Sequence, residues 1–356
     1  MDEYKPKINW RKTVGVMVLA MILMAVAGWL LSRENFYEML EAVKNADHLL
    51  IAAAIAIYFV SVAVWAIRWQ VAMSFIGCRM GFGIRYLILS ATIFLNNITP
   101  VARAGGDPFG RAYMMRKLGN INYSSGLASI IGEHALTPLV IVSFLMAGLI
   151  FRFGEGSLQL TLILTVVWVL VALGAVFGPR FFFKRRIAVR GVSGITNRVL
   201  GWFGRHTSVR ELVTGIEAFY ASTYATMDKW QHVLAMASWT LLIGALDVFR
   251  VYVIFLALGY HPTLPMLLVS SSLPVIFGMI PFLPGGLILV EGSFVSVFAL
   301  FGVPLNIGMA ATLIERGITF VLSTIVGAAV FSYLGIKMAA KPERSKVSED
   351  ARNISR

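Results

Sequence analysis

Long runs without a charged residue recur along the chain, and they decide its fold class. Thr13–Leu31 and Ser157–Gly178 are two such runs. Each is long enough to cross a hydrocarbon core about 30 Å thick as a helix. Lipid leaves helices and closed barrels as the only spanning structures, and the alternating pattern of barrel strands is absent. The hydrophobic pattern therefore predicts an all-α polytopic membrane protein.

The first run follows a basic start, so a cleaved signal peptide is one interpretation of it. Its apolar stretch is longer than the roughly 7–15 residues of a cleavable signal core. We expect it to be retained as the first span.

Composition agrees with this class. Of the 356 residues, 58% are hydrophobic and 14% are charged, whereas soluble domains average about 25% charged residues. The single cysteine, Cys78, excludes an intrachain disulfide framework and a cysteine cluster for a metal. We expect neither a cofactor nor a metal site.

The distribution of charge predicts the orientation. Eight Lys or Arg and no acid lie between residues 180 and 210, and the positive-inside rule places such a segment in the cytoplasm. The basic N-terminus and the tail at 337–356 follow the same rule. The loop Ser32–Asp47 carries four acidic residues and fits the outside. We expect a multi-pass protein of the plasma membrane with both termini cytoplasmic.

These sides are satisfied by six full spans, at about 13–31, 48–77, 121–151, 157–178, 231–259 and 305–335. The segment 84–118 must then enter and leave from the cytoplasmic side, and the segment between the last two spans must do so from outside. Each is predicted to be a re-entrant helical hairpin. The alternative, two full crossings at 84–118, would place the basic segment outside.

Four landmarks of the first half recur in the same order in the second half. They are an arginine, a proline, a Gly-Gly pair and a glutamate: Arg68, Pro100, Gly105-Gly106 and Glu133, then Arg250, Pro281, Gly285-Gly286 and Glu315. The separation from Arg68 to Arg250, here called the repeat offset, also separates the two glutamates, and the other counterparts nearly keep it. Because the two units begin on opposite sides, they predict an inverted-topology repeat, with its site near the midplane.

The predicted organisation is a single transmembrane domain, 1–336, followed by a polar cytoplasmic tail. Repeat A covers about 48–151 and repeat B about 231–335. The basic segment 179–230 joins them, and its capping box at Ser208–Glu211 precedes apolar residues at helical spacing. This pattern is typical of an amphipathic helix at an anionic lipid surface. Nucleic acid fits poorly, because no soluble domain remains to bind it.

Charges at membrane depth and the hairpin bends form the predicted translocation path. Charged residues inside a bilayer are costly and usually mark a site or a pathway. Helices that start after the Gly-Gly pairs would direct their positive ends at an anionic headgroup, with Asp107 as the N-cap and Pro108 as the first helical residue. The predicted path residues are Arg68, Pro100, Gly105, Gly106, Asp107, Arg111, Glu133, Asp247, Arg250, Pro281, Gly285, Gly286, Glu291, Glu315 and Arg316.

Structural roles for these charges stay open. Arg68 could extend its side chain to the cytoplasmic edge of the membrane. Asp247 and Arg250 are three positions apart, so they share a helix face and could pair to lock the fold. Glu133 and Glu315 could cap broken helices or hold the bends through hydrogen bonds. His134 is a weak candidate for a proton carrier.

Two segments carry a resemblance to a known family. They are NNITPVARAGGDPFGRAYMMRKLG at 96–119, followed by Glu133, and PFLPGGLILVEGSF at 281–294, followed by ATLIERGITF at 311–320. Over roughly residues 10–336 the chain resembles the lysylphosphatidylglycerol synthase transmembrane family, the flippase-like group also called UPF0104 or YbhN-like. One departure is that Glu133 precedes a histidine where Glu315 precedes an arginine, which questions a symmetric role for the two pairs.

This resemblance implies translocation of lipids between leaflets. In bifunctional members, a membrane domain of this kind moves an aminoacylated phospholipid made by a C-terminal synthase domain. The present chain is expected to be a stand-alone member, and its cargo could also be another phospholipid, a hopanoid or a polyprenyl-linked glycolipid.

We therefore expect a lipid flippase- or scramblase-like translocator that is not an enzyme. Its partners would be membrane lipids with anionic headgroups, with a second copy of the chain or a lipid- or glycan-biosynthesis enzyme as further partners. The alternatives are a secondary transporter of a small anionic solute and a non-transporting membrane partner of a lipid-modifying enzyme. A third is catalysis within the membrane by paired Glu and Arg.

Overall fold

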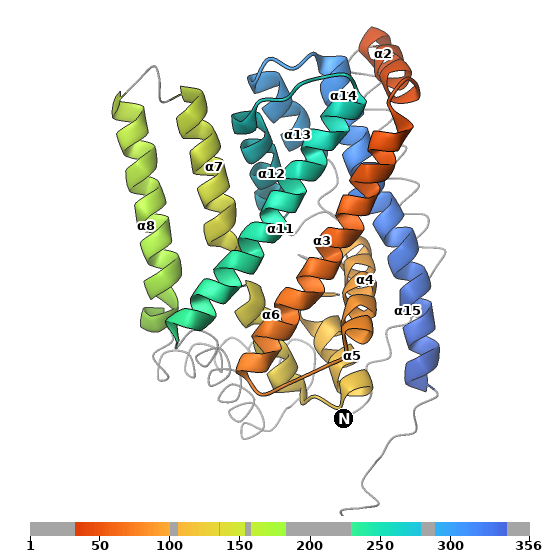
Figure 1. The fold of residues 1–356 in the computed structure, drawn as a ribbon, viewed down its shortest axis with the longest axis vertical. Coiled ribbons are helices and arrows are strands. Elements are labelled where there is room, and N and C mark those ends of the chain that lie inside the picture. The colour runs from red at the N-terminus through yellow and green to blue at the C-terminus, as the bar shows by residue number, and fades with distance from the viewer. Residues whose placement is uncertain are drawn as a thin grey trace, which may run out of the picture.

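The computed structural model describes residues 33–99, 106–134, 136–153, 158–182, 229–278 and 289–339. Every regular element within these ranges is a helix (Figure 1). The predicted all-α class is therefore confirmed for the described residues. The predicted first span, most of the basic segment and nearly all of the tail lie outside them.

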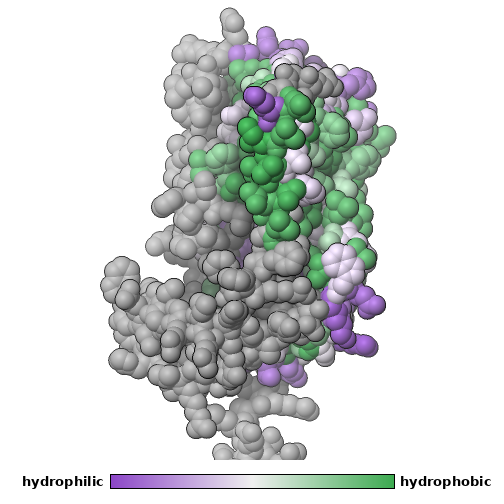
Figure 2. All heavy atoms as spheres, turned by 90° about the vertical axis from the view of Figure 1, so that its left-hand side faces the viewer, coloured by the Kyte–Doolittle hydropathy of each residue, from purple (hydrophilic) through white to green (hydrophobic). Residues whose placement is uncertain are grey.

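Four helical stretches are long and apolar enough to cross a membrane: His48–Phe75, Tyr123–Phe153, Trp230–Ala257 and Leu305–Ala339. They match four of the six predicted spans to within a few positions. A fifth prediction, 157–178, falls on α8 (Leu158–Phe182). Exposed large apolar side chains line α8, and Figure 2 faces this side: apolar residues cover the middle of the described surface, with polar ones toward both ends. Such a surface suits contact with lipid.

The centre of the fold is a pair of 28-residue helices, α3 (His48–Phe75) and α11 (Trp230–Ala257), which cross side by side (Figure 1). α3 starts at Asp47, whose Oδ1 accepts hydrogen bonds from the N–H groups of Leu49 and Leu50 at 2.8 and 3.2 Å. It ends just before Gly77, which adopts a φ of +72°. Fully buried alanines on α3 allow close approach of its neighbours.

Two pairs of short helices flank this centre. α4 (Phe82–Ile98) and α5 (Phe109–Gly119) have 17 and 11 residues, and α12 (Leu264–Gly278) and α13 (Leu289–Leu300) have 15 and 12. Each is shorter than the roughly 20 residues that cross a bilayer. In Figure 1, α4 and α5 lie in the lower half of the molecule and α12 and α13 in the upper half.

Two of the apolar spans are interrupted at corresponding positions of the two halves. α6 (Tyr123–His134) gives way to α7 (Thr137–Phe153) directly after Glu133-His134. α14 (Leu305–Arg316) ends directly after Glu315-Arg316, and the π-helix η3 (Gly317–Leu322) then leads into α15 (Ser323–Ala339). Single π turns inside α-helices are frequent at functional sites.

The helix boundaries repeat along the chain. The bounds of α11 follow those of α3 by the repeat offset at both ends, and the bounds of α14 follow those of α6 in the same way. The starts of α4 and α12 are also related by the repeat offset. The packing is reciprocal, because α4 lies against α15 while α12 lies against α7. The first short helix of each half, α4 or α12, thus packs on the last helix of the other half.

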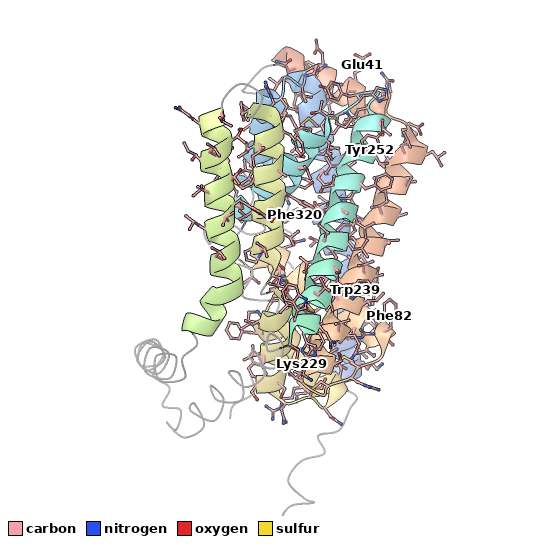
Figure 3. All side chains as sticks on the ribbon, turned by 60° about the vertical axis from the view of Figure 1, so that its left-hand side comes forward. Glu41, Phe82, Lys229, Trp239, Tyr252 and Phe320 are labelled. Atoms are coloured by element: carbon pink, nitrogen blue, oxygen red, sulfur yellow. The ribbon has the colours of Figure 1, made fainter. Side chains whose placement is uncertain are left out.

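The stretch Ser32–Asp47, predicted as an external loop, contains the helix α2 (Arg33–Lys44). It packs against α14, and Met39 is buried. The loop prediction rested on acidic charge, which indicates the side of the membrane but not the presence of a helix. Glu41 of α2 and Lys229, which precedes α11, lie at opposite ends of the molecule (Figure 3).

Candidate functional site

Arg68 of α3 points into the interior and meets Glu133 at the end of α6. Its Nε and Nη2 donate to Oε1 of Glu133 at 3.3 and 3.2 Å. Its Nη1 donates to Oγ1 of Thr240 on α11 at 3.2 Å. Arg68 is only 4% exposed and Glu133 is fully buried. The interpretation of Arg68 as a side chain reaching for the membrane edge is therefore wrong.

The second oxygen of Glu133 is taken by Arg111 of α5. Nη2 of Arg111 lies 2.5 Å from Oε2 of Glu133, and its Nη1 lies 3.3 Å from Oδ1 of Asp107. The guanidinium stacks on Trp69 of α3, with Cζ 3.7 Å from the ring centroid. One glutamate thus joins two arginines from different helices inside the protein.

Asp107 does not cap α5 as predicted. The helix begins at Phe109, and Pro108 occupies the cap position without a side-chain hydrogen bond. The carboxylate of Asp107 faces Arg111 instead, and the backbone N–H of Asp107 donates to Oδ1 of Asn96 at 2.9 Å. A buried arginine one turn away offers a stronger partner than a helix terminus, so the carboxylate turns to it.

The second half holds a corresponding ion pair, and we call the pairs Arg68–Glu133 and Arg250–Glu315 the arginine–glutamate bridges. Arg250 of α11 binds Glu315 of α14 in a bidentate arrangement, Nε to Oε2 at 3.0 Å and Nη2 to Oε1 at 2.7 Å. Its Nη1 lies 2.6 Å from Oδ1 of Asp247, which confirms the predicted pairing one turn apart. Neither glutamate acts as a helix cap through its side chain, because both carboxylates are held by arginines.

Each bridge also touches the other half of the molecule. Arg68 of α3 donates to Thr240 of α11, and the guanidinium of Arg250 lies over the ring of Tyr58 on α3, 5.7 Å from its centroid. Tyr58 and Thr240 are themselves related by the repeat offset. The contact between α3 and α11 is therefore reciprocal, as in a two-fold symmetric interface.

A second, outer pair lies beside each bridge. In the second half, Nε of Arg316 donates to Oε1 of Glu291 on α13 at 2.6 Å. In the first half, Nε2 of His134 lies 3.8 Å from Oδ2 of Asp107. The residue after the bridging glutamate thus faces an acidic side chain in both halves, as an arginine in the second half and as a histidine in the first.

The two halves differ in the charge that accompanies the bridge. Arg111 has Ser293 at the corresponding position, and Asp247 has Trp65. The first bridge is therefore accompanied by an additional cation and the second by an additional anion. The planar fork of N–H donors on a guanidinium fits the oxygens of a carboxylate and of a phosphate alike.

The structure brings ten of the predicted path residues into these two clusters or their immediate surroundings. Gly106 borders the cluster around Glu133. A Cβ at Gly106 would come closer than 3.0 Å to the Asn96 side chain and to the Thr92 carbonyl oxygen. The others, all in the predicted bends, lie outside the described residues: Pro100, Gly105, Pro281, Gly285 and Gly286. Among described residues, no group of three His, Cys, Asp or Glu side chains is placed to hold a metal.

Three contributors were not predicted: Tyr58, Thr240 and Trp69. The repeat offset relates Tyr58 to Thr240 in the sequence, but the two residue types differ, so matching identities could not find the pair. Trp69 follows Arg68 directly and therefore points elsewhere on α3. Its role depends on where α5 packs, which the sequence does not reveal.

Comparison with known proteins identifies a family of membrane proteins. Residues 14–327 match the family model described as the lysylphosphatidylglycerol synthase TM region. A UPF0104 membrane protein of Methanothermobacter thermautotrophicus is 28% identical over 93% of this chain and 96% of its own length. A UPF0104 membrane protein of Pyrococcus horikoshii is 23% identical over 88% of this chain and 94% of its own length.

A further relative is larger. The glycosyltransferase AglD of Haloferax volcanii is 28% identical over 97% of this chain, and the match covers 58% of that protein. The family match spans most of the chain and includes both arginine–glutamate bridges, so the resemblance noted from the sequence is confirmed. The chain belongs to the family described as the lysylphosphatidylglycerol synthase TM region.

Proposed function

We propose that this protein moves lipids between the two leaflets of a membrane, as a flippase- or scramblase-like translocator rather than as an enzyme. The observation that carries this proposal is the pair of buried arginine–glutamate bridges at corresponding positions of the two halves, linked through α3 and α11. Buried charges of this kind are costly in a membrane and usually serve a substrate or an ion.

The architecture we infer is an inverted-topology repeat of six full spans and two re-entrant hairpins. The hairpins would be α4 with α5, and α12 with α13. Support comes from their short lengths, their positions in opposite halves of the molecule (Figure 1) and the recurrence of helix bounds at the repeat offset. In transporters with such repeats, the substrate site lies between the halves, near the midplane.

The chemistry of the bridges suits a phosphate-bearing headgroup. A phosphate can replace Glu315 on the guanidinium of Arg250, because both anions offer two oxygens to the same fork of N–H donors. The released carboxylate could then bind an amine of an aminoacylated headgroup. In the first half, Arg68 and Arg111 offer two forks around one glutamate. Anionic and aminoacylated phospholipids would thus use the same groups.

The comparisons favour a lipid over another cargo. The family is described by a synthase whose product, lysylphosphatidylglycerol, is a phospholipid. The same membrane region also accounts for more than half of a protein named as a glycosyltransferase. We infer that this membrane region has the same role beside both kinds of synthetic enzyme. Moving a lipid product across the bilayer would be such a role. A polyprenyl-linked glycolipid is therefore a second class of cargo, in a protein of the plasma membrane.

A reconstitution experiment tests this proposal. Full-length protein in liposomes is given fluorescent lipids with anionic, zwitterionic, lysylated or polyprenyl-phosphate headgroups, and the fraction accessible to an impermeant quencher is followed. We expect faster equilibration than in empty vesicles for at least one anionic or aminoacylated lipid. Arg250→Ala should abolish the gain, whereas Arg116→Ala, a matched change of an exposed arginine on α5, should not.

Lipid movement no faster than in empty vesicles for every headgroup would refute the proposal. Uptake of glycerol phosphate in the same vesicles, without lipid movement, would instead establish the transporter of a small anionic solute.

A further inference from the structure

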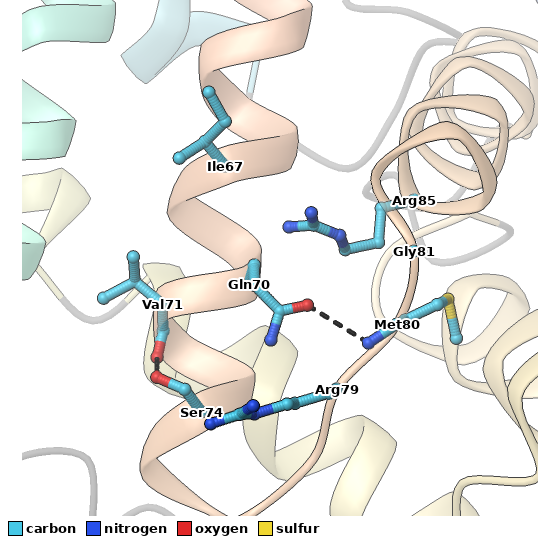
Figure 4. Close-up of a pocket in the computed structure, with 8 residues that line it drawn as sticks. All are labelled: Ile67, Gln70, Val71, Ser74, Arg79, Met80, Gly81 and Arg85. Carbon is cyan, nitrogen blue, oxygen red and sulfur yellow. Dashed lines mark hydrogen bonds between the residues drawn. The ribbon is translucent and has the colours of Figure 1, made fainter.

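A cavity of about 610 Å³ opens where α3 ends and α4 begins (Figure 4). Polar and cationic groups from both elements line it, among them Gln70, Ser74, Arg79, Gly81 and Arg85. The cavity has the size of a small-molecule site. It is separate from the arginine–glutamate bridges, because Arg68 points from α3 toward α6.

Arg85 is the buried cation of this cavity. Its residue is 7% exposed, and its Nη1 donates to the carbonyl oxygen of Ala66 at 2.7 Å. Among the described residues, no acceptor lies within hydrogen-bonding distance of its Nε. Figure 4 shows the guanidinium directed from α4 into the space beside α3. A buried donor without an acceptor is costly, and an anion in the cavity would satisfy it.

The wall beside Arg85 favours an anion too. α4 starts after Gly81, which has no side chain to cap the free N–H groups of the first turn. These groups and the helix dipole make that end positive. Gln70 fixes the segment that leads into α4. Its Oε1 accepts from the N–H of Met80 at 3.1 Å (Figure 4), and its Nε2 donates to the carbonyl oxygen of Cys78 at 3.3 Å.

Cations line the cavity without a compensating acid among the described lining residues. Arg79, an exposed residue, and Arg85 line it, and none of those lining residues is Asp or Glu. Two arginines, an uncapped helix start and neutral polar groups together match the chemistry of a phosphate monoester or diester.

The other half does not repeat this chemistry. The repeat offset carries Arg79 and Arg85 onto His261 and Leu267, and it carries Gln70 onto Tyr252. Leu267 is buried in the apolar core. The anion-binding groups therefore belong to one end of the molecule. In Figure 1, this is the end at which α8 ends and α11 begins, and these helices flank the basic segment.

We propose that this cavity is a loading site that binds the phosphate of a lipid headgroup in the cytoplasmic leaflet, before the headgroup reaches the arginine–glutamate bridges. This inference rests on the proposed lipid translocation for its purpose, but phosphate binding itself does not require transport. We infer the cytoplasmic side from the positive-inside rule, because α8, which lies at this end, leads into the basic segment of the sequence.

Direct binding tests it. Full-length protein in detergent is titrated with dioctanoyl phosphatidylglycerol, with dioctanoylglycerol and with inorganic phosphate, and affinity is read by calorimetry and by thermal shift. We expect saturable binding of the phospholipid and none of the uncharged diacylglycerol. Arg79→Ala and Arg85→Gln should each weaken binding by about tenfold or more, since hydrogen bonds to charged groups contribute that much. Arg116→Ala should leave it unchanged.

Two further arms keep the result decisive. Arg79 is exposed, so its variant tests the site even if Arg85→Gln fails to fold, and Arg85→Lys should retain part of the affinity. Inorganic phosphate that binds as tightly as the phospholipid would support an anion site filled from solution rather than from the leaflet. Unchanged phospholipid affinity in Arg79→Ala and Arg85→Gln would overturn the inference.

The outcome is separable from the proposed function. If the variants lose binding but the wild-type protein moves no lipid in liposomes, the cavity stands and the translocation proposal fails. If lipid moves and the variants bind phospholipid as the wild type does, only the loading site fails.

Discussion

Glu133 and Glu315 occupy corresponding positions but differ in their hydrogen-bond donors. Glu133 accepts hydrogen bonds from Arg68 and Arg111, both buried, whereas both carboxylate oxygens of Glu315 accept from Arg250. Arg250 also keeps Asp247 as a second partner. Loss of Glu133 would leave one buried guanidinium without a carboxylate and the other with Asp107 only.

Glu133→Gln should therefore destabilise the protein more than Glu315→Gln does. Breaking a buried ion pair by removing one member costs about 3–5 kcal/mol, and Asp247 should reduce the cost in the second half. Thermal unfolding in nanodiscs measures the difference, with Glu38→Gln on the exposed face of α2 as the control. Equal losses, or a larger loss for Glu315→Gln, would show that the two carboxylates do not differ in this way.

At the scale of helices, two glycines set the spacing of the reciprocal contacts. A Cβ at Gly148 of α7 would come within 3.0 Å of the Pro265 carbonyl on α12, and one at Gly327 of α15 would come within 3.0 Å of the Ser90 carbonyl on α4. Both close approaches involve backbone, which cannot turn away. Small residues at such positions let membrane helices pack closely.

Alanine at Gly148 or at Gly327 should lower the unfolding temperature, with a cost of about 1–3 kcal/mol for overpacking a tight contact. Gly335, on the same helix as Gly327, faces open space among the described residues. Gly335→Ala should therefore leave stability unchanged or raise it slightly, because alanine favours the helix. A similar loss for all three variants would mean that helix contacts are not what these glycines protect.

The hydrophobic pattern and the repeated landmarks predicted much of the helix arrangement. The length of the apolar runs predicted the spans that form α3 and α11, and the repeat offset in the sequence relates Arg68 and Glu133 to Arg250 and Glu315. The packing of Arg111 on Trp69 was not predictable, because it depends on the path of the chain between α4 and α5. The π turn after Arg316 has no signal in periodicity either.

At the scale of the whole molecule, the native cysteine reports orientation. Cys78 lies between α3 and α4, at the end of the molecule that we assign to the cytoplasm. Burial raises the pKa of its thiol, which lowers the thiolate fraction at neutral pH. Alkylation should therefore be slow near pH 7 and accelerate as the pH rises toward 9.

An impermeant maleimide at pH 8.5 should label Cys78 in inverted membrane vesicles and leave it unlabelled in intact cells. Because Cys78 is the single cysteine of the chain, no background substitution is needed, and protein unfolded in detergent gives the full signal for reference. Labelling in intact cells but not in inverted vesicles would reverse the orientation and would move the loading cavity to the opposite leaflet.

The most direct test of lipid translocation separates a structural bridge from a functional one. Removing both members of a buried ion pair in favour of apolar side chains is often tolerated, because no unpaired charge remains. The triple variant Asp247→Asn, Arg250→Met and Glu315→Met also changes Asp247, because that carboxylate would otherwise lose Arg250 as its partner. Reconstituted in liposomes, it should remain folded and monodisperse but should move fluorescent lipid no faster than empty vesicles. A folded triple variant that moves lipid at the wild-type rate would show that the bridge only holds the helices together.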